Sequence, residues 1–463
     1  MDAKTKLLLE GPIGWTLLRL SMPNIAVMAA QALVGLIETY FIAWLGTDAL
    51  AGIAIVFPVF MLFQMISAGA MGGGILSAVA RALGAGRKDE ADLLVWHAVA
   101  LALGLGVLTT LVMLPAGPSL YGLMGGREAS LAAAIVYANL VFGGAILLWL
   151  FNSLAAVIRG TGNMILPALV VLGGVVVLIP LSPLLIFGFG PLPRLGIIGG
   201  ATAVLIYYAV GSAIFVGYIW SGRGILHPSW KIPALSFARL ADILRVGAPA
   251  SLVATTTNVT IATATAFVGV YGPQAVAGYG TGARLEYLLV PLVFGLGAPL
   301  GAMVGTAVGA GEFQRAAKAA WTGAFMAGFL TEAVGVAAAL WPRSWLDLYG
   351  NDPVMMDFGI RYLRIVGPFY GFFGFGLALY FAAQGTGRMI WPLAAGVARL
   401  AVAAGGGFLA TRLVAGTTGV YVALAAGMIL FWGINAFAVF SGAWLRHVPL
   451  RRAEAPVILA VAE

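Results

Sequence analysis

The sequence predicts an all-α integral membrane protein whose twelve transmembrane helices form two six-helix lobes, related by a pseudo-twofold axis along the membrane normal. Its 463 residues are 61% hydrophobic and only 9% charged, whereas a soluble domain has about 25% charged residues. Apolar segments long enough to cross a bilayer, about 20 residues each, recur along nearly the whole chain. The second half also repeats motifs of the first half. Together these observations predict a doubled helical membrane protein.

The first six spans precede a break in composition. They are expected at 16–45, 49–75, 91–115, 131–157, 165–189 and 196–221. The first of them is long and contains Pro23, which can break a helix. Charged residues then return in "GRGILHPSWKIPALSFARLADIL", at 222–244. We therefore expect an N-terminal lobe at 12–221 and a linker at 222–244.

The remaining six spans follow the linker and form a C-terminal lobe at 245–446. They are expected at 245–271, 278–306, 316–341, 358–383, 389–411 and 418–445. The chain contains 64 glycines, and such small residues let membrane helices pack closely.

Lysine and arginine residues predict the orientation, because cytoplasmic loops carry an excess of them. With a cytoplasmic N-terminus, 17 of these residues, Arg159 included, lie on the cytoplasmic side and 6 on the other. Both termini and the linker are therefore expected in the cytoplasm. The basic residues lie in short loops, so the pI near 9.8 does not indicate a nucleic-acid partner. The N-terminal "MDAKTKLLLEGPIG" lacks an apolar signal region, and we expect no cleavable signal peptide.

Three motifs of the first half recur in the second half, 226, 225 and 225 positions later. The pairs are "WLGTDALAG" and "VYGPQAVAG", "LGAGRKDEADLLVW" and "VGAGEFQRAAKAAW", and "RGTGNMILP" and "QGTGRMIWP". An even number of spans in each repeat gives both halves the same orientation, which places the pseudo-twofold axis along the membrane normal. Two such lobes facing a central cleft are typical of transporters.

Several motifs resemble those of the multidrug and toxic compound extrusion (MATE) transporters. They are "SMPNI", "IETYFIAWLG", "ALGAGRKDEA", "VGAGEF", "RGTGN" and "QGTGR". The resemblance covers residues 12–445 and is closer to the DinF-like than to the NorM-like branch. It implies a transporter rather than an enzyme, one that exports organic compounds in exchange for a cation by rocking of its lobes. We expect a monomer in a prokaryotic cytoplasmic membrane that handles small organic substrates and needs no cofactor besides an ion gradient.

Glu38 is the first candidate for ion coupling. A carboxylate inside a bilayer is costly, so it either reaches water at the outer interface or faces a cavity. In MATE proteins this region of the first helix typically carries an aspartate implicated in proton coupling, and the resemblance implies that role for Glu38. Gln31 lies two turns earlier on the same helix face. Gln31 and Asn152 match positions that line the N-terminal cavity of DinF-like relatives.

Two departures from the family patterns bear on the coupling ion. DinF-like relatives carry an asparagine and an aspartate in the fifth helix, where this chain has Leu178 and Ser182. A hydroxyl does not bind a proton as a carboxylate does, so Ser182 stays only a cavity candidate. The NorM-like branch uses acids of the seventh and tenth helices, but the repeat counterpart of Glu38 is Ala264 and the predicted tenth helix has no carboxylate. Sodium needs oxygen ligands, so we expect proton coupling, with sodium as the alternative.

Four charged residues inside predicted helices of the C-terminal lobe are further candidates for a functional or structural role: Glu286, Arg284, Glu332 and Arg399. Glu286 is the second coupling candidate, because some MATE branches carry a similar "RLE"; a charge at the outer interface is the alternative. Arg284 is two residues away, and residues at that spacing do not face each other on a helix. Glu332 is expected to have a structural partner such as an arginine. Arg399 should have a carboxylate or helix-end partner, with anion binding as the alternative.

Polar and aromatic side chains of the seventh and tenth helices are candidate cavity residues. They are Thr256, Asn258, Thr260, Thr263, Phe369 and Tyr370. The three threonines share a face that suits a wet cleft, although threonines also bond back to their own helix. Aromatic faces attract organic cations, with plain packing as the alternative.

Other classes of function fit less well. A membrane enzyme would need a convergent catalytic set, and the chain has three histidines and no cysteine. A channel would need a selectivity filter, and no motif of the sequence indicates one. The main alternative is a flippase for a lipid-linked precursor, and such proteins usually line their cavity with several basic residues. Here the charges inside the predicted helices are three glutamates and two arginines, which favours a cationic or neutral cargo.

Overall fold

The computed structural model describes the backbone at residues 2–188, 193–350, 352–413 and 416–445. Side chains are described over the same ranges, apart from residues 31–39 and 287. Over these ranges all regular structure is helical. The predicted fold class, twelve transmembrane helices in two lobes, is confirmed. Among the described residues ten helical segments are long and apolar enough to cross a membrane, and the bent pair Glu128–Gly143 and Ala145–Gly160 makes an eleventh span. The 31-residue helix Ile13–Ala43 is the twelfth.

The first half of the chain supplies six spans. Its elements are α1 (Ala3–Glu10), α2 (Ile13–Ala43), α3 (Thr47–Met65), the π-helix η1 (Ile66–Met71), α4 (Gly72–Gly84), α5 (Lys88–Leu123), α6 (Glu128–Gly143), α7 (Ala145–Gly160), α8 (Ile165–Phe187) and α9 (Ile197–Trp220). From α3 to α4 the chain is one continuous span. Between α6 and α7 the chain bends by 48°. Gly143 and Gly144 lie at this bend, as expected for a kink at small residues.

The second half supplies the other six. Its elements are α10 (Phe237–Gly269), α11 (Pro273–Gly309), α12 (Phe313–Leu340), α13 (Arg343–Leu346), α14 (Pro353–Val366), the short 3₁₀ helix η2 (Gly367–Phe369), α15 (Tyr370–Thr386), α16 (Ile390–Arg412) and α17 (Gly416–Phe440). The segment from α14 to α15 is one span.

Two expectations about helix limits differ from the structure. Pro23 lies inside α2, which continues through it without a break. At the other site, α10 begins at Phe237, so residues 237–244 of the expected linker are helical. Charged residues such as Arg239 and Asp242 mark where a segment leaves the membrane. A helix can continue past that point, because its backbone hydrogen bonds do not depend on the surrounding solvent.

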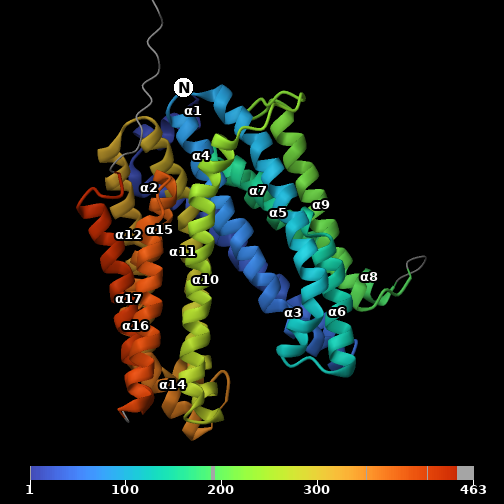
Figure 1. Ribbon diagram of the computed structural model, residues 1–463, viewed down its shortest axis with the longest axis vertical. Helices are drawn as coiled ribbons and strands as arrows, with labels where there is room; N and C mark the ends of the chain where they lie inside the picture. The colour runs from blue at the N-terminus through green and yellow to red at the C-terminus, as the bar shows by residue number, and fades with distance from the viewer. Residues whose placement is uncertain (1, 189–192, 351, 414–415, 446–463) are drawn as a thin grey trace, which may run out of the picture.

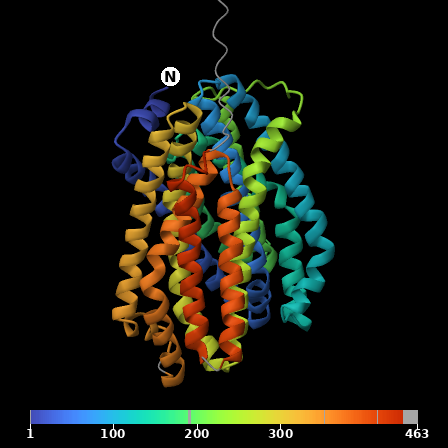
Figure 2. The ribbon, with the colours of Figure 1, turned by 60° about the vertical axis from the view of Figure 1, so that its left-hand side comes forward.

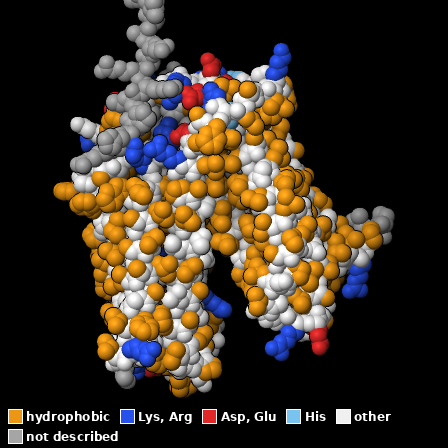
Figure 3. All heavy atoms as spheres, viewed as in Figure 1, with side chains coloured by type: hydrophobic (Ala, Val, Ile, Leu, Met, Phe, Trp, Pro, Cys, Tyr) orange, Lys and Arg blue, Asp and Glu red, His pale blue; other side chains and the backbone are white. Residues whose placement is uncertain are grey.

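The two lobes contact each other at one end of the molecule and separate towards the other end. Figure 1 shows α10, α12 and α14–α17 in one bundle and α3 and α5–α9 in the other, with the bundles diverging away from the N-terminus. The view in Figure 2 shows the long helices of the C-terminal lobe running side by side. In the space-filling view a cleft separates the lobes at the end opposite the N-terminus (Figure 3). At the closed end α4 packs against α10, α11 and α15 of the other lobe.

The sequence repeat is also a structural repeat. Gly86 and Gly311, 225 positions apart, have φ of 72° and 81°. Gly162 and Gly387, again 225 apart, have φ of 80° and 81°. This backbone region is open to glycine at little cost, so corresponding loops of the two lobes turn in the same way.

The same symmetry governs the contact between α4 and α11. A Cβ atom added at Gly84 would lie 2.1 Å from the carbonyl oxygen of Thr306, and one added at Gly309 would lie 2.1 Å from that of Arg81. Gly84 and Gly309 are 225 positions apart, and so are Arg81 and Thr306. The two helices therefore cross at the pseudo-twofold axis, where only glycine permits so close an approach.

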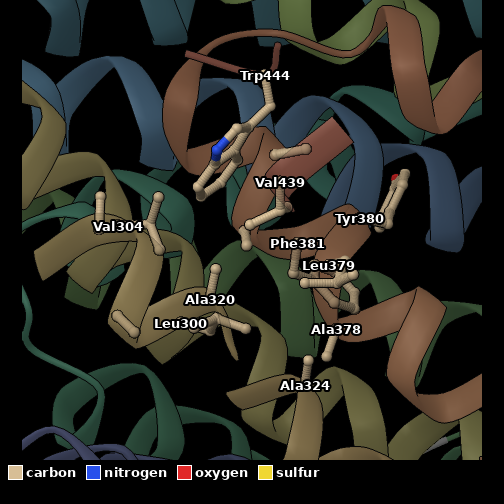
Figure 4. Packing of buried hydrophobic residues seen from close by; sticks show 14 of the residues in the cluster. Leu300, Val304, Ala320, Ala324, Ala378, Leu379, Tyr380, Phe381, Val439 and Trp444 are labelled. Carbon is tan, nitrogen blue, oxygen red and sulfur yellow. The ribbon is translucent and has the colours of Figure 1, made fainter. Parts of the chain in front are cut away.

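The C-terminal lobe packs around α15. Figure 4 shows this core, to which α11, α12, α15 and the end of α17 contribute. Its labelled members are Leu300, Val304, Ala320, Ala324, Ala378, Leu379, Tyr380, Phe381, Val439 and Trp444. Ala320 and Ala324 of α12 are fully buried, and their small side chains let α15 lie close to α12.

Candidate functional site

A cavity lies between the lobes where they meet. Its walls come from α2, α3, η1, α4, α7 and α8 on one side and from α11 and α15 on the other. Many lining residues are repeat partners, 225 positions apart. These pairs are Gly69 and Phe294, Gly72 and Gly297, Gly73 and Ala298, Leu76 and Gly301, Ala156 and Phe381, and Arg159 and Gln384. The cavity therefore lies on the pseudo-twofold axis.

The wall from the N-terminal lobe contains a connected set of polar side chains. The amide of Asn152 donates to Ser67 Oγ at 2.7 Å and to Gln64 Oε1 at 3.2 Å. The hydroxyl of Tyr208 also donates to Gln64 Oε1, at 3.3 Å. Ser67 lies in η1, and π-helical turns frequently occur at functional sites. The structure thus places Asn152 at the cavity, as the family resemblance implied, and adds Gln64 and Ser67.

Two further amides join the lobes across the cavity. Gln384 Nε2 donates to Tyr380 Oη at 2.9 Å and to the carbonyl of Gly69 in the other lobe at 3.1 Å. Asn24 Nδ2, from α2, donates to the carbonyl of Gly295 at 3.4 Å. The sequence analysis did not predict that Asn24, Gln64 or Gln384 belongs to the site. The feature that could have identified them is an uncharged amide side chain inside an apolar span. That feature is not specific, because such an amide can also make a purely structural hydrogen bond.

The prediction that Arg159 lies in a cytoplasmic loop was wrong. It lies in the last turn of α7 and lines the cavity. No ion pair or hydrogen bond joins it to the described residues, and its Nε is buried without a partner. Among the described lining residues it carries the only charge. The loop assignment was wrong because the predicted span ended at residue 157, whereas α7 ends at Gly160, one residue beyond Arg159.

Glu286 and Arg399 form an ion pair within the C-terminal lobe. Arg399 Nη2 lies 3.0 Å from Glu286 Oε1, and their side chains are 5% and 14% exposed. The hydroxyl of Tyr362 donates to Glu286 Oε2 at 3.2 Å. The Arg399 guanidinium lies 4.7 Å from the centre of the Phe373 ring. Arg399 thus has the carboxylate partner that its position required. Glu286 lies 13 residues into α11, about 20 Å along the helix, and not at its end.

The other two charges of this lobe have different partners. The guanidinium of Arg284 lies 5.2 Å from the ring centre of Tyr349 and, as expected, does not pair with Glu286. Glu332 was expected to have a structural partner such as an arginine, and the partner is a backbone group: the N–H of Gly371 donates to Glu332 Oε2 at 2.6 Å. Gly371 is in the first turn of α15, where N–H groups lack partners within the helix. Glu332 therefore caps α15.

The polar residues of α10 bond within their own helix. Thr256 Oγ1 donates to Val253 O and Thr260 Oγ1 to Thr256 O, each at 2.8 Å. Asn258 Nδ2 donates to the carbonyl four residues earlier at 2.9 Å. Thr263 is partly buried. The described cavity includes none of these four residues.

The remaining candidates are placed as follows. Phe369 packs on Phe372, with ring centres 6.0 Å apart, and Tyr370 is fully buried in the lobe core. Ser182 is buried in α8, and its Oγ has no partner among the described residues. Gln31 and Glu38 are on the helical backbone of α2, but their side chains lie outside the described residues.

A two-lobed helical bundle with a polar cavity on its symmetry axis defines a membrane transporter. The MatE family model matches residues 23–184 and 249–409, one segment in each half. The chain belongs to this family, the multidrug and toxic compound extrusion transporters, and is a secondary active efflux transporter. The resemblance drawn from the motifs is confirmed at the level of the family.

Relatives and solved structures agree with this placement. The chain is 30% identical over 383 residues to a protein of Shewanella oneidensis named "FAD transporter", covering 81% of this chain and 82% of the relative. It is 24% identical over 449 residues to the "Probable multidrug resistance protein NorM" of Thermotoga maritima, covering 94% of each. A structure titled "Crystal structure of MATE in the bent conformation" matches with a TM-score of 0.88 and 26% identity, covering 96% of this chain and 98% of that one.

Proposed function

We propose that this protein is a proton-coupled antiporter of the DinF-like branch that exports organic compounds across a prokaryotic cytoplasmic membrane as a monomer. The observation that supports this most is the cleft between the lobes, closed at the N-terminal end and open at the other (Figure 3). The distribution of lysine and arginine supports a cytoplasmic position for the N-terminal end. The conformation is then open to the outside, one of the two states that alternating access requires.

The closed end is held by contacts between the lobes. Arg81 Nη2 donates to both carboxylate oxygens of Asp242, each at 2.9 Å. Ser77 Oγ donates to the carbonyl of Gly385 at 3.1 Å. These contacts join α4 to α10 and to α15, and they must break for the cleft to open on the cytoplasmic side.

We place the coupling proton on Glu38, with Glu286 as the second candidate. A carboxylate that loads a proton from the outer side and releases it into the cytoplasm alternates between two charge states during the cycle. This alternation can link proton entry to cargo release outside. Sodium coupling has less support, because α15 has no carboxylate and Ala264 occupies the position that repeats Glu38.

Organic cargo is supported by the names of the relatives, which include an FAD transporter and multidrug resistance proteins. The expectation of a cationic or neutral cargo rested on three glutamates against two arginines inside the predicted helices. Arg159 is a third, and it lines the cavity, so that count no longer favours a cationic cargo. The flippase alternative gains the same residue, but the cavity lining described here has a single basic side chain.

The test is transport in proteoliposomes with proton and sodium gradients imposed separately. A pH gradient should drive exchange in the parent protein, Glu38→Gln should abolish it, and Glu38→Asp should retain part of it. Correct folding of each variant is checked by its thermal unfolding in detergent. Parental proton-driven transport by Glu38→Gln would move the coupling site to Glu286, and transport driven by sodium alone would reject proton coupling.

A further inference from the structure

Arg159 presents an unpaired positive charge to the interlobe cavity. Its Nε is buried without a hydrogen-bond partner, and no described carboxylate pairs with it. An arginine inside a membrane protein is costly unless a partner or water compensates its charge. Arg159 lines the cavity, so a bound molecule can supply the missing partner.

The neighbouring polar groups are neutral amides. Asn24, Gln64, Asn152 and Gln384 line the same cavity, and no glutamate or aspartate is among its described lining residues. The amide donors of Asn152 and Gln384 are already used in hydrogen bonds to the protein. Arg159 differs from these amides because it combines a donor without a described partner, its Nε, with a positive charge.

The sequence repeat shows whether the fold itself requires an arginine at the position of Arg159. The partner of Arg159 is Gln384, 225 positions later in the same motif, at the corresponding end of α15. Gln384 lines the same cavity and is buried. A neutral glutamine therefore satisfies the fold at this place in the repeat, and the positive charge of Arg159 is a feature of the N-terminal lobe alone.

We propose that Arg159 binds an anionic group, a phosphate or a carboxylate, of the transported molecule, so that the cargo class is organic anions. A guanidinium presents donors in a fork that matches two oxygens of such a group. This inference rests on the proposed function, because it takes the interlobe cavity as part of the cargo path. It assigns the site a charge preference opposite to the one expected from the helix-embedded charges.

Equilibrium binding with two matched probes tests the proposal. Riboflavin 5′-phosphate and riboflavin differ by one phosphate group, and flavin fluorescence reports binding to the protein in neutral detergent without any ion gradient. The parent should bind the phosphate at least about tenfold more tightly, the value expected for one charge-assisted hydrogen-bonded contact. Arg159→Gln should remove this difference, and Arg159→Lys should retain part of it. Arg87→Gln should behave like the parent, because Arg87 is not among the lining residues and pairs with Glu90.

Two results would overturn the proposal. One is a parent protein that binds the phosphate no more tightly than riboflavin. The other is an Arg159→Gln variant that loses affinity for both probes equally, which indicates a structural role. Because binding is measured without a gradient, a failure of proton coupling would leave these results unchanged, and the two hypotheses are tested separately.

A phospholipid headgroup carries the same chemistry as a phosphate-bearing cargo. Nanodiscs of neutral lipid and of neutral lipid with added phosphatidylglycerol separate the two sources. For a cargo site, the preference for riboflavin 5′-phosphate should persist in both. If phosphatidylglycerol abolishes the preference in the parent and has no effect on Arg159→Gln, the site belongs to the lipid and the assignment to cargo is wrong.

Discussion

At the scale of single residues, the ion pair of Glu286 with Arg399 shows why a charge inside a membrane helix has to be interpreted with its partner. The two residues are 113 positions apart and lie on α11 and α16. Tyr362 and Phe373 contact the same pair. A buried ion pair adds little net stability, but removal of one partner leaves the other charge uncompensated.

Glu286→Gln should therefore destabilise the protein, by about 3–5 kcal/mol in the free energy of unfolding. Arg399→Gln should have a similar effect, and the double variant should cost less than the sum of the two. Unfolding followed in detergent, arranged as a double-mutant cycle, measures this coupling. Additive effects would show that the pair is not a unit. Arg284→Gln is the control, because Arg284 contacts Tyr349 and not Glu286.

At the scale of elements, the crossing of α4 and α11 sets how close the lobes can come. Gly84 and Gly309 each face a carbonyl of the other helix. A methyl group there meets backbone, which cannot rotate away as a side chain can. The helices would have to separate, and overpacking of this kind costs about 1–3 kcal/mol.

Gly84→Ala should weaken the closed end and shift the population towards a state open on that side. Gly104→Ala in α5 is the matched control, since a Cβ there meets nothing within 4 Å and alanine favours the helix by up to about 1 kcal/mol. The chain has no cysteine, so introduced cysteine pairs can carry spin labels without background. Unchanged label distances in Gly84→Ala would show that the crossing tolerates a methyl group.

At the scale of the whole molecule, the contact between Arg81 and Asp242 spans the two lobes. Asp242 is 45% exposed at its side chain and Arg81 13%, so solvent screens the pair and its contribution is at most about 1 kcal/mol. Such a pair does not hold the closed end alone. It adds to the glycine crossing and to the bond of Ser77 with Gly385.

Asp242→Asn should therefore raise the population open at the N-terminal end by up to about fivefold. Spin-label distances between the ends of α4 and α10 report this population. Glu90→Gln is the control, because Glu90 pairs with Arg87 inside one lobe. An equal shift in both variants would mean that surface charge in general, and not this contact, sets the balance.

The sequence by itself determined the twelve spans, their division into repeats and the family. These are properties of local composition and of motif spacing. The repeat is also present in the backbone, because Gly162 and Gly387 have nearly the same positive φ. The sequence also predicted that Arg399 needs a carboxylate or helix-end partner, because burial in a membrane imposes one. The position of Asn152 at a cavity was implied by the family resemblance.

Only the tertiary structure decided which distant residues meet. The partner of Arg399 is Glu286 and that of Glu332 is a backbone amide, and neither choice is visible along the chain, because helix packing sets it. The exposure of Arg159 to the axial cavity depends on where α7 ends and on which neighbours surround it. Hydropathy averages over about 20 residues, so it places a helix in the membrane but does not say which of its faces meets a cavity.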